Sequence, residues 1–184
     1  MGTVRAVDLE TFNAATRRDA DAVLLSCCAS RRFAAAVTAG RPYPSLAAAE
    51  AATSAAFESL TWDDVLEALE HHPRIGARAD GRSDGAGWPG KHGKTAAEQS
   101  ASEQSASEQS GVADSDRAAL AAANAEYEAR FGHLFLICAS GLTGGQMLAE
   151  LRARLANNPD TERIVATREL QKITVLRLRK ALTP

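Results

Sequence analysis

The strongest constraint on this fold is a helix-start signal that recurs along the chain, followed each time by apolar residues at helical spacing. Thr61 and Asp64 form one such capping box, and the stripe behind it consists of Trp62, Val65, Leu66 and Leu69. Thr143 and Gln146 repeat the box before a second stripe. Asn158-Pro159 opens a last helix that should run to about residue 182, because proline suits the first helical position. The sequence therefore predicts an all-α protein.

Other caps and breaks predict the remaining helices. Asp8 caps a short first helix, a second includes residues 23–27, and a third covers residues 33–38. Ser45 caps an alanine-rich helix that reaches about residue 60. Asp116 caps a long helix that ends near Arg130.

Two segments do not fit a helix. Residues 79–94 are rich in glycine and have no apolar period, which predicts a loop. Residues 134–138 form a short continuous apolar run, for which we favour an extended segment. The length of 184 residues suits one compact domain, and alanine supplies much of the 45% hydrophobic fraction, as expected for close-packed helices.

Charge and cysteine usage narrow the possible partners and compartments. The chain has 21 basic and 23 acidic side chains, which gives a formal net charge of -2. Binding to nucleic acid or an anionic membrane normally needs an excess of positive charge, which this chain lacks. The three cysteines, Cys27, Cys28 and Cys138, are odd in number, and we interpret them as reduced core residues of an intracellular protein. No signal segment or run of transmembrane length is found. We expect a cytoplasmic protein that binds neither nucleic acid nor membrane.

His72 stands where the helix that starts at Trp62 must stop, because Pro73 disfavours helical geometry at the residue before it. His71 should still lie within the helix, and His72 should be extended and exposed just past its end. A histidine placed there can donate or accept a proton near neutral pH. From position alone, a histidine that merely bonds a nearby carbonyl is the commoner case.

Residues 95–109 contain three successive copies of one pentad, and each copy ends in Glu-Gln. Ser-x-x-Glu is also an ordinary capping box. A five-residue repeat turns each copy by about 140° around a helix axis, so Glu98, Glu103 and Glu108 cannot share one face. Gly111 follows only the last copy and introduces a turn. If one copy is functional, we expect it to be the copy that contains Glu108.

Arg177 continues the apolar stripe of the last helix, behind Ala166, Leu170 and Ile173. It either extends from the core edge to solvent, the commoner outcome, or acts as an anion or carbonyl clamp with paired donors. We expect solvated positions for Arg154, Arg163, Arg168 and Arg179. Strong metal-ligand spacing, a phosphate-binding glycine loop and a nucleophile elbow are all missing. An enzyme here would therefore work through proton transfer and oriented hydrogen bonds.

Several motifs lie in an order that resembles one known family. Residues 71–78 resemble a His-Pro-x-Ile-Gly signature, and residues 105–111 resemble the Ser-x-x-Glu-Gln motif that follows it. Further matching pieces are residues 12–14, 27–28, 127–132, 135–139, 154–157 and 172–178. Together they are similar to the OHCU decarboxylases, which convert 2-oxo-4-hydroxy-4-carboxy-5-ureidoimidazoline (OHCU) into (S)-allantoin during purine degradation. The resemblance spans nearly the whole chain.

This resemblance implies an all-α homodimer that needs neither metal nor organic cofactor. It implies that His72 is the acid/base, that Glu108 is the carboxylate that positions substrate, and that Arg177 is a substrate-binding cation. Pocket-lining roles are implied for Pro73, Ser105, Gln109 and Ile137, the last through its backbone.

Two departures from the family pattern keep alternatives open. The family normally has one Ser-x-x-Glu-Gln motif, often preceded by tryptophan, whereas this chain has three copies, and its nearest tryptophan, Trp88, stands before a longer loop. Glu98 or Glu103 could therefore take the place of Glu108. The alternative from a different class is a non-catalytic helical binding or scaffold module, with the pentads as a spacer and His72-Pro73 as a turn.

Overall fold

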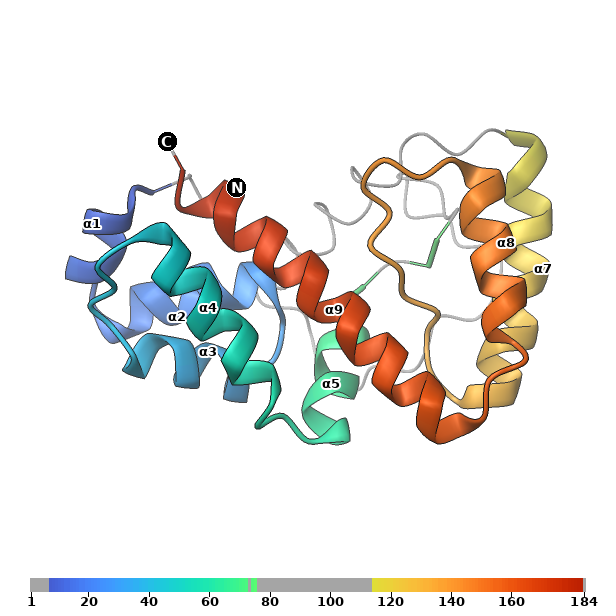
Figure 1. Ribbon diagram of the computed structural model, residues 1–184, viewed down its shortest axis with the longest axis horizontal. Coiled ribbons are helices and arrows are strands. Elements are labelled where there is room, and N and C mark those ends of the chain that lie inside the picture. Colours follow the sequence, from blue (N-terminus) through green and yellow to red (C-terminus); the bar gives the residue numbers. More distant parts are fainter. Residues whose placement is uncertain (1–6, 73, 76–113, 184) are drawn as a thin grey trace.

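The computed structural model describes residues 7–72, 74–75 and 114–183, with side chains in the last range described from residue 116 (Figure 1). These residues form helices and no strand: α1 (Leu9–Ala14), α2 (Arg17–Cys27), α3 (Arg31–Ala39), α4 (Leu46–Phe57), α5 (Trp62–Leu69), α7 (Asp114–Phe131), α8 (Gly144–Arg154) and α9 (Pro159–Ala181). The all-α prediction is confirmed. The predicted loop at 79–94, the pentads at 95–109 with Ser105, Glu108 and Gln109, and Pro73 all lie outside the described residues.

Most helices start where the sequence predicts, because side chains supply the caps. The Asp64 N–H donates to Thr61 Oγ1 at 3.3 Å, and the Thr61 N–H donates to Asp64 Oδ2 at 2.8 Å. Thr143 and Gln146 form the same reciprocal pair at the start of α8. Asp8, Ser45 and Asn158 cap α1, α4 and α9. Each cap satisfies an N–H group that the first turn of a helix leaves unpaired.

Two predicted boundaries were wrong by about two residues. The last turn of α5 tightens, because the N–H groups of His71 and His72 bond the carbonyls three residues back, at Ala68 and Leu69. His71 therefore lies in the turn after α5 and not inside the helix. Helix α7 starts at Asp114, before the predicted cap Asp116.

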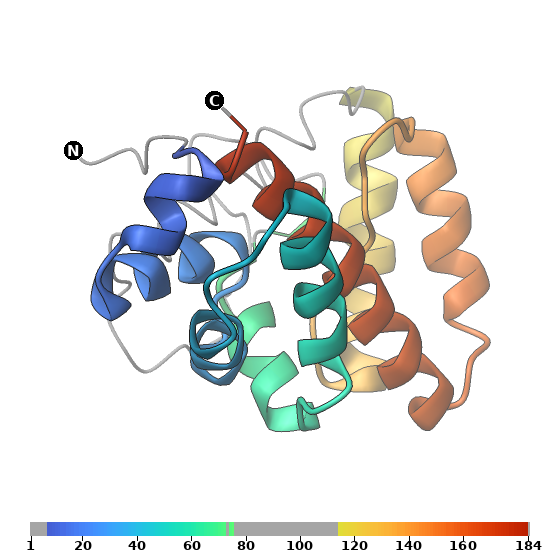
Figure 2. The ribbon, with the colours of Figure 1, turned by 60° about the vertical axis from the view of Figure 1, so that its left-hand side comes forward.

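The helices pack into two lobes that share α9 (Figures 1 and 2). The larger lobe contains α1 to α5 and the second half of α9, and its core includes Phe12, Leu24, Phe33, Phe57, Leu69 and Leu170. The smaller lobe contains α7, α8 and the chain between them, and its core includes Leu120, Tyr127, Phe135, Met147 and Leu151. Helix α9 packs on α2, α4 and α5, and its first turns reach the smaller lobe through Glu162.

The chain from 134 to 139 is irregular and runs between the two lobes. Leu136 and Cys138 pack against the larger core, whereas Phe135, Ile137 and Ala139 pack against the smaller one. This alternation has a period of two residues, which is the side-chain pattern of an extended backbone. The predicted extended segment at 134–138 is therefore consistent with the packing.

Cys27 and Cys28 are buried, which confirms their predicted place in the core, and Cys138 is half-buried. Burial raises the pKa of Cys27 to about 12 and that of Cys28 to about 11. Neither thiol is therefore available as a thiolate near neutral pH.

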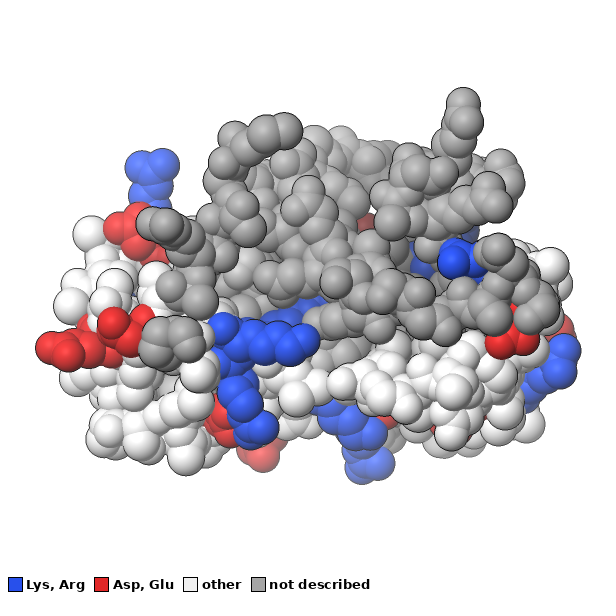
Figure 3. Space-filling model, turned by 90° about the horizontal axis from the view of Figure 1, so that it is seen from above, with Lys and Arg blue, Asp and Glu red and all other residues white. Residues whose placement is uncertain are grey.

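Charged side chains of both signs appear among the described residues on the face shown in Figure 3, in separate small groups. Within the described ranges, no helix is long and apolar enough to cross a membrane.

Candidate active site

The structure brings together two of the predicted site residues, His72 and Arg177, which are 105 positions apart in the sequence. Arg177 Nη1 on α9 lies 3.4 Å from His72 Nε2, at the end of α5. Both residues are buried, His72 to 6% exposure and Arg177 to 2%. The prediction that His72 would be exposed was therefore wrong. The helix end lies under α9 and beside the end of α2, two contacts that the local sequence around Pro73 does not encode.

The ring of His72 is held in one orientation by its own helix. His72 Nδ1 lies 2.9 Å from the Ala68 carbonyl oxygen, and a carbonyl only accepts, so Nδ1 carries the hydrogen. When Arg177 donates to Nε2, that nitrogen must offer its lone pair, which makes the imidazole neutral in this arrangement. His72 thus makes the carbonyl contact that the commoner interpretation predicts, and its role as an acid/base stays a prediction.

Arg177 is also held from the side of α2. Its Nη1 lies 3.4 Å from the carbonyl oxygen of Cys27, the last residue of α2. Carbonyls at a helix C-terminus carry partial negative charge, so this position attracts a cation. Both described contacts of Nη1 are longer than a usual N–H hydrogen bond. Arg177 is 2% exposed, so it does not extend from the core edge to solvent, and its role as an anion or carbonyl clamp stays a prediction.

The chain that follows His72 is anchored to α7. Arg74 donates to Glu128 through Nε and Nη2, both at 2.6 Å from the carboxylate oxygens. Asn124 Nδ2 donates to the Ile75 carbonyl at 3.0 Å, and the Ile75 side chain is buried in the smaller core. A bidentate pair fixes direction as well as distance. The chain that follows α5 is therefore attached to the smaller lobe as well as the larger.

Ile137 lies in the smaller core at 8% exposure, in the same cluster as Ile75. The carbonyl of its predecessor Leu136 accepts from Arg154 Nη1 at 2.7 Å. The N–H of its successor Cys138 donates to Glu169 Oε2 at 2.8 Å. The backbone around Ile137 is thus fixed by two charged side chains.

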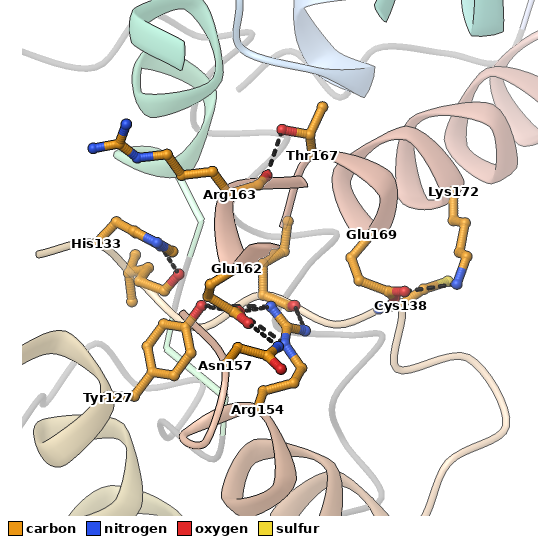
Figure 4. Close-up of polar contacts among 12 residues, drawn as sticks. Tyr127, His133, Cys138, Arg154, Asn157, Glu162, Arg163, Thr167, Glu169 and Lys172 are labelled. Atoms are coloured by element: carbon orange, nitrogen blue, oxygen red, sulfur yellow. Dashed lines mark hydrogen bonds and ion pairs between the residues drawn. The ribbon is translucent and has the colours of Figure 1, made fainter. Parts of the chain in front are cut away.

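A second buried polar cluster lies where α7, α8 and α9 meet (Figure 4). Arg154 Nη2 and Nε lie 2.5 Å and 2.8 Å from Glu162 Oε1, Tyr127 donates its phenol hydrogen to the same oxygen, and Asn157 Nδ2 donates to Oε2 at 2.7 Å. The side chains of Arg154 and Glu162 are 4% and 0% exposed. The prediction that Arg154 is solvated was therefore wrong, whereas Arg163, Arg168 and Arg179 are exposed as expected.

Both missed residues had a signal in the sequence. Arg154 follows Met147 and Leu151 at helical spacing on the buried face of α8. Glu162 lies four residues before Ala166, so it extends backward the same stripe that pointed to Arg177. Each charged side chain stands at the end of an apolar stripe on its helix, and the two charges neutralise each other in the core.

His133 lies between the lobes. Its ring packs edge-on against Trp62 of α5, 4.9 Å between centroids, and against Tyr127 of α7 at 5.4 Å. Burial lowers the pKa of His133, and it lies at 4% exposure. Burial and the hydrogen bond to Glu162 raise the pKa of Tyr127, so its phenol stays protonated.

Among the described residues, no group of three or more His, Cys, Asp or Glu side chains is arranged to hold a metal ion. A cavity of about 570 Å³ lies beside α1 and α2, and its lining contains none of the predicted site residues.

The described part of the chain is thus an all-α protein in which a histidine and an arginine form a buried pair. The chain belongs to the OHCU decarboxylase family, which it matches over residues 13–179. The 2-oxo-4-hydroxy-4-carboxy-5-ureidoimidazoline decarboxylase of Amia calva is 34% identical over 145 residues, which cover 79% of this chain and 77% of that protein. The uric acid degradation bifunctional protein TTL of Arabidopsis thaliana is 35% identical over 156 residues. That alignment covers 84% of this chain but only 44% of the Arabidopsis protein, so the chain spans less than half of it.

Solved structures agree with this assignment. A crystal structure of an OHCU decarboxylase in the presence of (S)-allantoin has a TM-score of 0.69 and 27% sequence identity, covering 89% of this chain and 99% of that one. A crystal structure of (S)-allantoin synthase shares the fold at a TM-score of 0.67 with 18% identity, covering 96% of this chain and 54% of that one.

Proposed function

We propose that this protein decarboxylates OHCU to (S)-allantoin in urate breakdown, using neither a metal nor an organic cofactor. The observation that carries the proposal is the buried pair of His72 and Arg177, formed by residues that match the family's motifs and lie 3.4 Å apart. A helical scaffold protein has no evident need for this pair, because removing a charged guanidinium from water costs free energy.

The reaction requires the protein to position the substrate more than to activate it. OHCU carries a carboxylate on a carbon next to a conjugated ring C=N, so the ring can accept the electrons left by CO2. The protein has to hold the carboxylate where it leaves and supply a proton to one face of the ring carbon. A single face of protonation yields one enantiomer.

In this proposal His72 moves the proton. Its Nδ1 is held on the Ala68 carbonyl, so Nε2, which lies beside Arg177, is the nitrogen left to take the substrate's hydroxyl proton or to return one to the ring carbon. Arg177 donates to substrate carbonyl oxygens with its planar fork. Glu108 accepts from ureido or ring N–H groups, and Ile137 contributes backbone groups. Pro73, Ser105 and Gln109 complete the lining.

We further propose a homodimer that works in the cytoplasm. The family resemblance supports the dimer, and the reduced, buried Cys27 and Cys28 support a reducing compartment. Neither nucleic acid nor membrane is a partner in this proposal, because the net charge of -2 offers no strong basic footprint.

One assay tests the activity directly. Urate is mixed with urate oxidase and hydroxyisourate hydrolase, and allantoin formation is followed by circular dichroism with and without this protein. We expect faster formation and an excess of the (S)-enantiomer over the spontaneous racemic product. The alternative, a non-catalytic binding or scaffold module, predicts neither acceleration nor enantiomeric excess.

The same assay decides among the three pentads. Glu108→Ala should lose most activity while its melting temperature stays near normal, and Glu98→Ala and Glu103→Ala should stay active. Alanine keeps helix propensity, so a lost cap alone would remove about 1 kcal/mol of stability or less and leave catalysis unchanged. An inactive Glu98→Ala beside an active Glu108→Ala would assign the site to the first copy.

A further inference from the structure

Ile137 lies between two peptide groups that are each bound by a charged side chain. Arg154 Nη1 donates to the carbonyl of Leu136 at 2.7 Å, and Glu169 Oε2 accepts from the N–H of Cys138 at 2.8 Å. Among the described residues, the N–H and carbonyl of Ile137 itself have no hydrogen-bond partner. The two bound groups belong to the neighbours, and the two groups in between remain available to a ligand.

Because each peptide unit is planar, these two contacts fix the directions of the backbone groups of Ile137. The Leu136 carbonyl and the Ile137 N–H belong to one peptide unit, and in a trans unit they point in opposite directions. The same holds for the Ile137 carbonyl and the Cys138 N–H. Both units are trans, because the one cis bond of the described chain lies at Arg41-Pro42. Holding the neighbours' groups on Arg154 and Glu169 therefore points the N–H and carbonyl of Ile137 the other way.

The extended backbone places these two groups side by side. Side chains at 135, 137 and 139 face the smaller core and those at 136 and 138 face the larger one, the alternation of a strand. In a strand the N–H and carbonyl of one residue lie on the same edge, the arrangement by which two antiparallel residues exchange two hydrogen bonds. Ile137 thus offers a donor and an acceptor as a pair. A ureido group, with an N–H beside a carbonyl, is the complementary ligand chemistry.

The charges also strengthen this pair. A cation on the Leu136 carbonyl polarises that peptide and makes the Ile137 N–H a better donor. An anion on the Cys138 N–H makes the Ile137 carbonyl a better acceptor. The positive charge of Arg154 and the negative charge of Glu169 therefore strengthen both backbone groups of Ile137. Exchanging the two charges would weaken both groups.

We propose that Arg154 and Glu169 are positioning residues that direct the backbone N–H and carbonyl of Ile137 at the ureido group of the substrate. The inference rests on the proposed function. Glu169 is the better residue to test, because Arg154 also holds Glu162 in the buried cluster and its loss would unfold the smaller lobe. The side chain of Glu169 is 13% exposed, near the surface, where it also pairs with Lys172 at 2.6 Å.

Three variants separate the positioning role from the ion pair. Glu169→Ala removes the acceptor for the Cys138 N–H, Glu169→Gln keeps a neutral acceptor, and Lys172→Met removes the ion pair alone. We expect Glu169→Ala to lower kcat/KM by about tenfold, the loss of roughly one hydrogen bond to a charged group, and to lower the enantiomeric excess. Glu169→Gln should recover most of both, and Lys172→Met should resemble the wild type. Melting temperatures measured in parallel detect any general loss of stability.

Two results would overturn the inference. One is a folded Glu169→Ala variant with wild-type kcat/KM and enantiomeric excess. The other, decisive even if that variant fails to fold, is an unchanged Ile137 amide signal when ¹⁵N-labelled wild-type protein is titrated with (S)-allantoin. If the wild type itself produced no (S)-allantoin excess, the proposed function would fail first, so the two failures are distinguishable.

Discussion

The two buried arginines, Arg154 in the smaller lobe and Arg177 in the larger, show how differently one residue type can be used. Arg154 lies 2.5 to 2.8 Å from a carboxylate oxygen and a carbonyl, with a phenol on the same carboxylate. The described contacts of Arg177 are an imidazole nitrogen and a carbonyl, each at 3.4 Å. Short bonds to an opposite charge suit a permanent joint, whereas contacts as long as these two are weak and can be replaced by stronger bonds to a substrate. The smaller lobe uses its arginine for stability, and in our proposal the larger lobe uses its arginine for chemistry.

The largest effect should come from breaking the buried ion pair of Arg154 and Glu162. Glu162→Ala leaves the buried guanidinium of Arg154 and the phenol of Tyr127 without their acceptor, which should lower the free energy of unfolding by about 3–5 kcal/mol. Urea denaturation followed by circular dichroism measures this loss. Asp160→Ala is the control, because Asp160 lies in the same first turn of α9 with a 93% exposed side chain and should have little effect. Similar losses in the two variants would contradict the assignment.

The next effect should fall on turnover. His72→Asn removes the proposed acid/base and should lower turnover by about 100-fold or more while the fold stays intact. His71→Asn is a matched control, because His71 Nδ1 lies 2.9 Å from the Glu67 carbonyl, the same local contact that His72 makes with Ala68. His71→Asn should therefore change turnover little. Equal, small effects in the coupled assay would remove His72 from the mechanism.

A smaller effect should fall on substrate binding. Arg177→Lys keeps the charge but loses the planar fork, so KM should rise by about tenfold with a lesser change in turnover. Arg179→Lys, two residues along α9, changes an exposed arginine that pairs with Glu50 and should leave both constants unchanged. If KM and turnover of Arg177→Lys matched those of the wild type, the distinction between the two buried arginines would fail.

The smallest effect should be on the pH dependence of stability, through His133, which lies between the lobes. Because burial lowers the pKa of His133, the unfolded chain takes up a proton at higher pH than the folded chain does. Stability should therefore fall as pH drops below about 6.5, the usual pKa of histidine. His133→Phe keeps an aromatic ring and removes the titration, so unfolding curves between pH 7 and pH 5 should diverge less than in the wild type. Parallel curves for the two proteins would show that His133 contributes nothing to the acid response.

The helices could be predicted from the sequence because their causes are local. The boxes at Thr61 and Thr143 and the Asn158-Pro159 start involve contacts three residues apart, and the structure confirms all three. The stripe behind Arg177 marked it as a candidate for the same local reason. Pairing between distant segments has no such signal. The predicted solvated position of Arg154 is wrong because its partner Glu162 belongs to another helix, and the burial of His72 depends on α9.

Part of the candidate site was reached only through resemblance to a family. The motif order pointed to Glu108 and Ile137, whereas the pentad spacing predicts only that Glu98, Glu103 and Glu108 would face different directions on a helix. Glu108 lies outside the described residues and remains a prediction. The backbone around Ile137 could not be foreseen, because Arg154 and Glu169 approach it from helices that start after it in the chain.

The sharing of α9 by both lobes has a consequence for how the chain is made. Helices α1 to α8 leave the ribosome before α9, yet the larger core lacks Leu170, Ile173 and Leu178 without it, and the smaller lobe lacks the carboxylate that neutralises Arg154. Neither half can therefore finish folding as it emerges, and both should consolidate together once α9 is free. Until then the nascent chain should expose two incomplete apolar surfaces, and such surfaces promote aggregation during synthesis.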